Sequence, residues 1–556
     1  MNNISQLINS SSNGMIDVVI ELLNQNTNIE VVNNNNMTPL HCASLKGHLN
    51  IVCELLNRNA NIEALDKSNM TPLHCASLED HKNIVCELLN RNANIEAVDS
   101  DNMTPLHCAS INGYPNIVIE LLNRNANIEA LDNMNHTPLH WASAQGYHNI
   151  VCELLNRNAN IEALENDNIT PLHMASQGGH LNIVCELLNR NANIEALDKY
   201  NYTPLFCALE KKYINIVVEL LNRNANTNVI NIKNFTPLHY ASANCGKDIV
   251  IELLNRNANI EATDDMNYTP LHFASENGII DVVIELLNRD ANIEPLDKNG
   301  MTPLHMASQV GYLNIVCELL NRNANIDAMT DIGYTPMHCA LIEGHTDIVI
   351  GLLNRNANIK AMDNMNYTLL HFASMKGYMN IVTELLNRNA NIDAVTNVGY
   401  TPMHCALIEG HTDIVIGLLN RNANIEAKGY RNYTPLHIAS SGSNINIIQE
   451  LLNRDADINA LTVCGFTPYD IAVKKNHCQD IILLLNSYKF KDNMVRENDM
   501  NYINTLVKRF TCPICDDKER KVVFNCRHST CIECSEKLSE CYECKIKIIN
   551  RTIMYL

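Results

Sequence analysis

The sequence predicts a mainly α-helical solenoid of helix pairs joined by hairpin loops, followed by a small zinc-bound module. Three observations lead to this fold class. A Thr-Pro-Leu-His block or a close variant returns every 33 residues, each interval carries the pattern of two short helices, and seven cysteines cluster near the C-terminus. A constant period over most of a chain indicates a repeat array, in which each unit packs on its neighbours.

The repeat blocks set the domain organisation. Residues 1–37 hold the same phase in degenerate form, through Ser5-Gln6-Leu7 and the apolar run from Val18 to Leu23. We therefore expect an N-terminal capping repeat over 1–37 and an array of 33-residue units over 38–488. The blocks begin, without insertion or deletion, at Thr38, Thr71, Thr104, Thr137, Thr170, Thr203, Thr236, Thr269, Thr302, Thr335, Thr368, Thr401, Thr434 and Thr467.

The unit that begins at Thr137 shows the expected local structure. Thr137 is a suitable N-cap for a first helix, and Pro138 suits its first position. Gly146 ends that helix, and the apolar spacing from Ile150 to Leu155 predicts a second. Asn158 takes the place where a left-handed residue is needed. The stretch 161–168 then predicts a hairpin-like loop that leads to the next Thr.

In these motifs the array resembles the ankyrin repeat family. The 33-residue period, T-P-L-H-x-A-S, G-H/Y-x-x-I-V and L-L-N-R-N-A-N-I-E-A match its pattern over nearly nine tenths of the chain. The resemblance implies a solenoid that holds protein partners with its helices and hairpin tips.

Local departures from this pattern predict local differences in geometry. Asp80 and Asn476 can adopt a left-handed conformation, whereas Lys212 and Cys245 suit it less well. The polar final unit suits a terminal cap. Five residues replace the glycine between the helices, one replaces the proline and two replace the histidine: Asp80, Lys212, Cys245, Ser443 and Asn476; Leu369; Phe206 and Asp470.

The residue directly before each Thr varies in an informative way. It is mostly Met in the first units and aromatic in the later ones, and both types are frequent in protein interfaces. We predict a substrate-binding stripe at these positions, with shielding of the next hairpin as the alternative. The stripe comprises Met37, Met70, Met103, Tyr202, Phe235, Tyr268, Tyr334, Tyr367, Tyr400 and Tyr433.

The repeated histidines and cysteines predict packing roles. One His per unit, such as His140, stands beside a Thr at a helix start, which favours an internal hydrogen bond over metal or acid–base chemistry. The repeat cysteines recur at fixed phases without Cys-x2-Cys pairs, as in Cys42 and Cys53, which indicates small buried side chains.

Composition narrows the partners and the compartment. Lys plus Arg is 41 and Asp plus Glu is 61, a formal net charge of −20, which argues against nucleic acid and anionic membranes as partners. No segment approaches the roughly 18 apolar residues of a membrane span, and no signal peptide is evident. We expect reduced thiols and a cytoplasmic protein, with the nucleus as an alternative, or the host cytoplasm if the source is viral.

The C-terminal cluster predicts a metal-dependent module over residues 511–556, after a charged linker over 489–510. Seven thiols and one imidazole are enough soft ligands for two tetrahedral zinc ions. So short a segment with few apolar residues needs metal for its folding energy. The ligands are Cys512, Cys515, Cys526, His528, Cys531, Cys534, Cys541 and Cys544.

The order of three cysteines, one histidine and four cysteines resembles the RING finger family. The resemblance implies interleaved sites: Cys512, Cys515, Cys531 and Cys534 for one zinc, and Cys526, His528, Cys541 and Cys544 for the other. A tandem, LIM-like pairing is the alternative. RING fingers recruit a ubiquitin-charged conjugating enzyme and supply no nucleophile, so no covalent catalytic residue is expected here.

Further site residues follow from the same resemblance. Ile514 and Leu538 are expected in the groove that receives the conjugating enzyme, with Tyr542 and Lys545 beside it. Tyr542 stands where a Pro is usual, and Lys545 where many members have Arg. Tyr555 matches a tail aromatic that contacts ubiquitin in dimeric classes, which implies a RING homodimer; an ordinary closing strand is the alternative.

The leading hypothesis is therefore a RING-type ubiquitin ligase whose solenoid chooses the substrate. The alternative is a non-catalytic scaffold with a zinc module for dimerisation or docking, which Tyr542 and Lys545 favour. Residues 495–556 hold eleven basic and nine acidic side chains, +2, so residues 1–494 carry −22. The expected substrates accordingly have basic or mixed surfaces.

Overall fold

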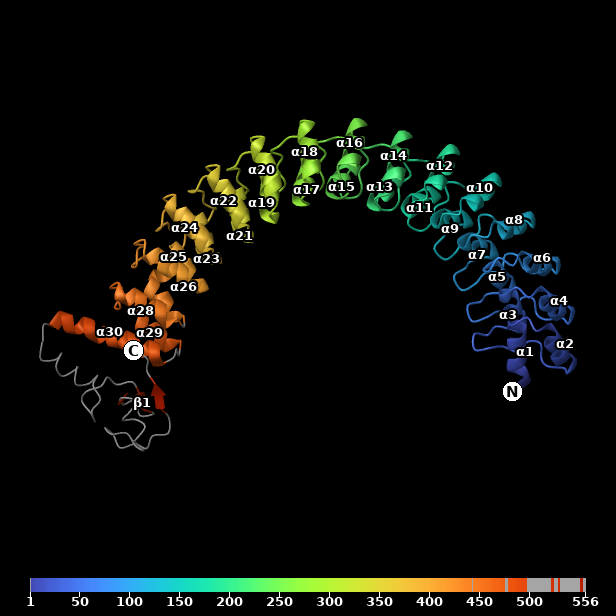
Figure 1. The fold of residues 1–556 in the computed structure, drawn as a ribbon, viewed down its shortest axis with the longest axis horizontal. Coiled ribbons are helices and arrows are strands. Elements are labelled where there is room, and N and C mark those ends of the chain that lie inside the picture. Colours follow the sequence, from blue (N-terminus) through green and yellow to red (C-terminus); the bar gives the residue numbers. More distant parts are fainter. Residues whose placement is uncertain are drawn as a thin grey trace. The chain divides into compact units, whose positions relative to one another are not determined.

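The computed structural model describes residues 2–442, 444–475 and 479–497, and the backbone of three short strands farther on (Figure 1). The chain divides into two compact units, Met1–Lys298 and Asn299–Leu556. Both contain consecutive helix pairs in which the first helices pack on first helices and the second helices on second helices.

The first compact unit contains nine helix pairs within its described residues. The first helices are α1 (Asn2–Ser12), α3 (Pro39–Lys46), α5 (Pro72–Ser77), α7 (Pro105–Asn112), α9 (Pro138–Gln145), α11 (Pro171–Gly178), α13 (Pro204–Glu210), α15 (Pro237–Asn244) and α17 (Pro270–Glu276). The second helices are α2 (Ile16–Asn24), α4 (Leu49–Asn57), α6 (Lys82–Asn90), α8 (Pro115–Asn123), α10 (His148–Asn156), α12 (Leu181–Asn189), α14 (Ile214–Asn222), α16 (Lys247–Asn255) and α18 (Ile280–Asn288).

The second compact unit continues the same pattern. Its first helices are α19 (Pro303–Val310), α21 (Pro336–Glu343), α23 (Leu369–Lys376), α25 (Pro402–Glu409), α27 (Pro435–Ser441) and α29 (Pro468–Lys474). Its second helices are α20 (Leu313–Asn321), α22 (Thr346–Asn354), α24 (Met379–Asn387), α26 (Thr412–Leu419), α28 (Ile445–Asn453) and α30 (Gln479–Glu497), and a 3₁₀ turn, η1, covers Tyr430–Asn432. The predicted solenoid of helix pairs is confirmed.

The helix ends follow the signals in the sequence. In α9, the Thr137 side chain accepts a hydrogen bond from the His140 backbone N–H, and Pro138 occupies the first helical position. Gly146 ends the helix in the left-handed conformation, with φ 87°, which glycine adopts readily because it has no Cβ. Asn158, after α10, has φ 62°, which confirms its predicted left-handed role.

The core lies between the two layers of helices and between successive pairs. Leu139 and Ile150 are 1% exposed, and Ala142, Val151 and Leu154 are fully buried. Since one pair cannot enclose these side chains alone, the apolar faces are covered only when the neighbouring pairs are stacked against them.

The departures from the repeat pattern have local consequences. Asp80 adopts the left-handed conformation as expected, with φ 57°, and Lys212 adopts it too, with φ 60°. Cys245 instead has φ −103°, and the following Gly246 takes the positive φ of 89°. Leu369 begins α23 in place of Pro, with Thr368 still capping the helix. Ser443 and Asn476 lie outside the described residues.

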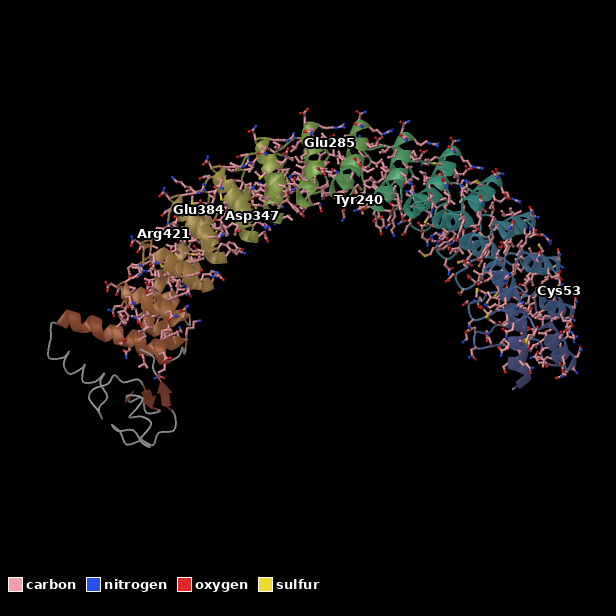
Figure 2. All side chains as sticks on the ribbon, in the orientation of Figure 1. Cys53, Tyr240, Glu285, Asp347, Glu384 and Arg421 are labelled. Carbon is pink, nitrogen blue, oxygen red and sulfur yellow. The ribbon has the colours of Figure 1, made fainter. Side chains whose placement is uncertain are left out.

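Polar side chains link successive units at the ends of the second helices. Arg157 Nε lies 2.6 Å from Glu153 Oε1, and its Nη2 donates to Asn123 Oδ1 of the preceding unit at 2.7 Å. Individually such exposed pairs contribute roughly 0.3–0.5 kcal/mol. In two units Gly351 and Gly417 replace this glutamate, so that Arg421 (labelled in Figure 2) keeps its bond to Asn387 at 2.7 Å without a carboxylate in its own helix.

The last helix extends farther than the sequence predicts. Helix α30 runs to Glu497, so the first nine residues of the predicted linker over 489–510 are helical. Near residue 488 the helix is fixed to α28, because Tyr488 donates its hydroxyl to Asn453 Oδ1 at 2.8 Å. Within the described part of the chain, no helix is both long enough and apolar enough to cross a membrane.

Three strands beyond α30 form one small antiparallel sheet. They are β1 (Val522–Phe524), β2 (Ser529–Thr530) and β3 (Arg551–Ile553), in the order β2-β1-β3. Val523 pairs with Ser529 on one side and with Thr552 on the other.

We predict that Gly146→Ala destabilises its unit more than Gly410→Ala destabilises its own. Both glycines have φ above 80°, so each alanine costs about 1–2 kcal/mol of backbone strain. A Cβ on Gly146 would also lie 2.6 Å from the His180 ring, which is held in place by a hydrogen bond between its Nε2 and Ala144 O at 2.9 Å. A Cβ on Gly410 would have no neighbouring atom within 4 Å. Hydrogen exchange of α10 and α26 measures the two effects. An equal loss of protection in both helices would show that the contact with the His180 ring adds no destabilisation.

Candidate functional site: the hairpin face

The hairpin loops form one face of each compact unit, and each loop is closed by its own side chains. In the loop between α10 and α11, Glu165 Oε1 accepts from the backbone N–H groups of Asp167 at 2.8 Å and Ile169 at 2.9 Å. Asn168 has φ 62°. Asn166 N–H donates to Met134 O of the preceding loop at 3.0 Å. These bonds confirm a hairpin-like loop and tie successive loops together.

The repeated histidine fixes each loop to the following unit. Thr71 donates its backbone N–H to His74 Nδ1 at 3.1 Å, so the ring proton lies on Nε2. Nε2 then donates to the carbonyl of Met103, the stripe residue of the next unit, at 3.0 Å. His74 is fully buried. The predicted internal hydrogen bond is confirmed, and both ring nitrogens are occupied by it.

Burial keeps these histidines neutral. Desolvation lowers the pKa of His41, His74, His107, His173, His239, His404 and His437, and it lowers the pKa of His140, His338 and His371 to about 4. The hydrogen bonds from Nε2 to backbone carbonyls oppose this effect without cancelling it. A buried, neutral imidazole is unsuited to proton transfer with a bound partner, and in all of these histidines except His338 both ring nitrogens are also engaged in hydrogen bonds.

The predicted stripe residues are half-buried in the structure. The Tyr334 ring stacks on His338 at 5.7 Å between centroids, and the Phe235 ring stacks on His239 at 5.1 Å. Burial also raises the pKa of Tyr268 to about 12. The rings thus cover the histidine bonds of their own units while one edge stays accessible, and the carbonyls of Met70 and Met103 accept from the histidines of the preceding units.

A second loop position is more exposed, and it is apolar in twelve units, with Thr263 and Lys428 as the exceptions. Sequence reasoning missed this position. It stands directly before the loop carboxylate or its replacement, and its side chains are 43–63% exposed. Its 33-residue period is visible in the sequence and could have identified it. This exposed row comprises Val32, Leu65, Val98, Leu131, Leu164, Leu197, Ile230, Leu296, Met329, Met362, Val395 and Leu461.

Carboxylates accompany the exposed row. Glu162, two residues before Leu164, accepts the backbone N–H of Asn193 in the next unit through Oε1 at 2.7 Å. The same bond recurs between Glu129 and Asn160, again at 2.7 Å. A face that alternates exposed apolar side chains with carboxylates suits protein surfaces of apolar and basic character.

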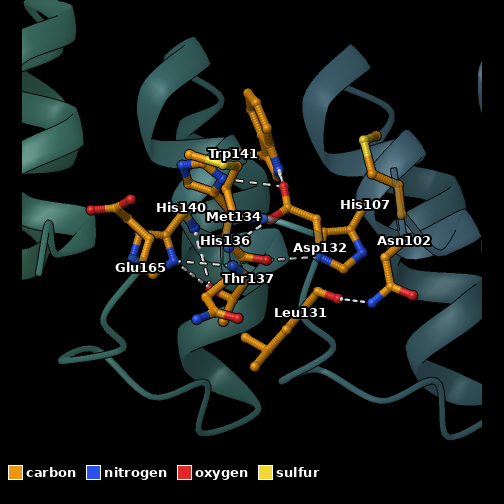
Figure 3. Close-up of polar contacts among 12 residues, drawn as sticks. Asn102, His107, Leu131, Asp132, Met134, His136, Thr137, His140, Trp141 and Glu165 are labelled. Atoms are coloured by element: carbon orange, nitrogen blue, oxygen red, sulfur yellow. Dashed lines mark hydrogen bonds and ion pairs between the residues drawn. The ribbon is translucent and has the colours of Figure 1, made fainter. Parts of the chain in front are cut away.

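One loop carries a buried polar cluster around Asp132 (Figure 3). Asp132 Oδ1 accepts from the backbone N–H groups of Met134 and His136 at 2.8 Å, and Oδ2 lies 3.0 Å from Trp141 Nε1 and 3.1 Å from His136 Nδ1. Burial alone would raise the pKa of Asp132, but these hydrogen bonds outweigh it and lower the pKa. With every lone pair engaged, the cluster stabilises the loop.

The eight predicted zinc ligands, and Ile514, Leu538, Tyr542, Lys545 and Tyr555, all lie outside the described residues. Strand β1 ends two residues before Cys526, and β2 begins directly after His528. Among the residues with described side chains, no group of three or more His, Cys, Asp or Glu side chains could hold a metal ion. The thirteen repeat cysteines described are free thiols.

Comparison with known proteins matches most of the chain to one family. The model described as "Ankyrin repeats (3 copies)" matches residues 7–99, 92–165, 151–231, 210–297, 285–363 and 358–429, and the model "Ankyrin repeats (many copies)" matches residues 418–472.

Two curated relatives share short segments with this chain. The E3 ubiquitin-protein ligase RGLG4 of Arabidopsis thaliana is 42% identical over 45 residues, 8% of this chain and 11% of that protein. The E3 ubiquitin-protein ligase MIB2 of Gallus gallus is 37% identical over 60 residues, 11% of this chain and 6% of that protein. The matches therefore span only a small part of either relative.

Proposed function

The chain belongs to the ankyrin repeat family, and from this premise we propose that it is a RING-type ubiquitin ligase whose solenoid selects protein substrates. The observation that carries the proposal is the set of seven cysteines and one histidine between residues 512 and 544. The ligase names of the two relatives agree with it. Ubiquitin and a ubiquitin-charged conjugating enzyme would be the partners of the C-terminal module.

The donor set fits two zinc ions. Thiolates and imidazole are the ligands that tetrahedral structural zinc prefers. In the interleaved arrangement Cys512, Cys515, Cys531 and Cys534 would hold one ion, and Cys526, His528, Cys541 and Cys544 the other. With four protein ligands on each ion, no position would remain for a reactive water, so the ions would serve folding.

The described strands support a single compact module. Since β1 pairs with β2, the short connection that contains Cys526 and His528 would lie at one end of this hairpin. Since β1 also pairs with β3, the backbone near residue 552 lies beside the backbone that leads to Cys526. The strands on both sides of Cys531, Cys534, Cys541 and Cys544 are thereby held in one sheet, and Cys512 and Cys515 precede its first strand in the sequence.

The proposed activity depends on positioning. The module would bind the conjugating enzyme through Ile514 and Leu538 and hold its thioester in a reactive orientation towards a substrate lysine, which raises the effective concentration of the reacting groups. Tyr542 and Lys545 would border this groove. Tyr555 would contact ubiquitin from the partner subunit of a RING homodimer.

A non-catalytic scaffold is the second candidate. Lys545 is a poorer bidentate donor than the Arg common at its position, and Tyr542 replaces a Pro, so the two residues together favour weaker binding of the conjugating enzyme. In that case the solenoid would still bind proteins and the zinc module would serve dimerisation.

Auto-ubiquitination of the full-length chain with a panel of conjugating enzymes separates the two functions. We expect ubiquitin chains with the wild type and at least a tenfold lower rate with Ile514→Ala, which keeps every zinc ligand. Leu7→Met, a near-isosteric change in the capping repeat, is the matched control and should leave the rate unchanged. Absence of chains from the wild type, or an unchanged rate with Ile514→Ala, would exclude the ligase.

A further inference from the structure

An open groove lies on the hairpin face of the second compact unit, where the loop before α21 meets the loop before α19. Its volume is about 350 Å³. Met301, Tyr334 and Ile342 supply apolar walls, and Asp331 and Glu343 stand at its polar side. The groove thus combines an apolar interior with two carboxylates.

The charge around the groove is one-sided. Residues 299–345 contain four carboxylates and one basic side chain, a net charge of −3. The basic side chain, Arg322, forms an ion pair with Glu318 at 2.7 Å. Asp331 and Glu343 are exposed, and neither forms an ion pair with the described residues of this unit. Their field therefore favours a cation in the groove.

The apolar part of the groove is partly fixed and partly open. Tyr334 is held by its stacking on His338, whose ring is buried. Ile332, which also lines the groove, is 55% exposed, and Met329 of the exposed row is 63% exposed. An aliphatic chain could lie along these side chains while its charged end reaches the carboxylates.

We propose that this groove binds an arginine or lysine side chain of an extended protein segment. The stem of the side chain packs against Met301, Tyr334 and Ile342, and its cation lies between Asp331 and Glu343. The inference deepens the proposed function, since the segment would belong to a substrate. Only the identification of the bound protein as a ubiquitination substrate rests on the proposed function. The binding itself requires no ubiquitin chemistry.

The chain contains a natural comparison for this groove. Residues 399–425 repeat residues 333–359 without a difference, so Tyr400, Ile408 and Glu409 correspond to Tyr334, Ile342 and Glu343. Outside the repeated stretch the two positions differ: Asn397 occupies the place of Asp331, and Tyr367 occupies the place of Met301. One carboxylate is lost and a larger side chain is introduced, so the second position lacks the proposed combination.

Fluorescence anisotropy with the full-length chain tests the proposal. The probes are four labelled decapeptides, Gly-Ser-Leu-Ser-Xaa-Leu-Ser-Leu-Gly-Ser, with arginine, lysine, norleucine or glutamate at Xaa. We expect the arginine and lysine peptides to bind at least tenfold more tightly than the norleucine and glutamate peptides. The difference should decrease as salt rises, since exposed charges are screened.

Two variants locate the binding. The double variant Asp331→Asn and Glu343→Gln should reduce the affinity for the arginine peptide about tenfold, to the level of the norleucine peptide, whereas Glu409→Gln should leave it unchanged. No binding to the wild type, equal affinity for arginine and norleucine, or an equal loss with Glu409→Gln would overturn the proposal. Auto-ubiquitination of the same variants keeps the two proposals separate, because none of the three substitutions lies in the C-terminal module.

Discussion

Lowering the pH from 7.5 to 5 is expected to destabilise the solenoid strongly, far more than its surface charges would. The cause is the set of buried histidines that hold the hairpin loops, and ten of them have a lowered pKa. In the folded chain the pKa of these ten lies below the usual 6.5, and it is about 4 for His140, His338 and His371, because burial disfavours the charged ring. In the unfolded chain the same rings have the ordinary pKa of about 6.5.

The direction of the effect follows from proton linkage. Above pH 6.5 both states are neutral, and the hydrogen bonds contribute in full. As the pH falls below 6.5, the unfolded chain takes up protons that the folded chain does not, so the free energy of unfolding decreases until the folded pKa is reached. For a histidine with a folded pKa of about 4, the loss at pH 5 is on the order of 2 kcal/mol.

Urea unfolding at several pH values, followed by circular dichroism and by hydrogen exchange, measures this loss. The unit that begins at Thr203 is an internal control, because Phe206 replaces its histidine. We expect slower exchange at pH 5, after correction for intrinsic rates, in α13 than in α9 or α11. A uniform pH response along the array would show that the histidines are not the cause. The transition need not be two-state in a repeat protein, so local exchange is the firmer measurement.

Removal of zinc is expected to unfold the C-terminal module and leave the solenoid intact. Structural zinc contributes roughly 10–16 kcal/mol to the folding of small domains, more than the few apolar residues of 511–556 can replace. The helix pairs depend on their own apolar contacts. We therefore expect about two zinc ions per full-length chain by this ligand count, and their loss on chelation without loss of the helical signal.

Cys531→Ser measures the same dependence without chelator. It should lower the zinc content measured by mass spectrometry and make the segment after α30 sensitive to protease. Cys464→Ser is the matched control, since Cys464 is an exposed thiol in a hairpin loop of the array. Full zinc content in Cys531→Ser, or an equal loss in Cys464→Ser, would contradict the ligand assignment.

Much of the fold could be predicted from local sequence, because the signals act within one unit. Thr137, Pro138 and Gly146 fix where α9 begins and ends, and Asn158 supplies the left-handed turn after α10. The neutral, bonded state of the histidines could also be inferred, since a Thr three residues earlier at a helix start leaves few other partners. The extension of α30 to Glu497 was missed, because its charged residues look like a linker until Tyr488 packs on α28.

The sequence by itself determined the period, the helix pairs, the caps and the acidity of the array, and it supplied the cysteine and histidine pattern from which the zinc site is proposed. Only the tertiary structure decided which apolar position of each loop faces solvent. The predicted stripe, such as Tyr334, is half-buried over a histidine, and the row that includes Met329 is exposed instead. The physical reason is that exposure depends on the neighbouring unit. The carbonyl of Tyr334 accepts a hydrogen bond from His305 Nε2 of the preceding unit, and most other units repeat this contact, which turns one position inward and leaves the other open to a partner.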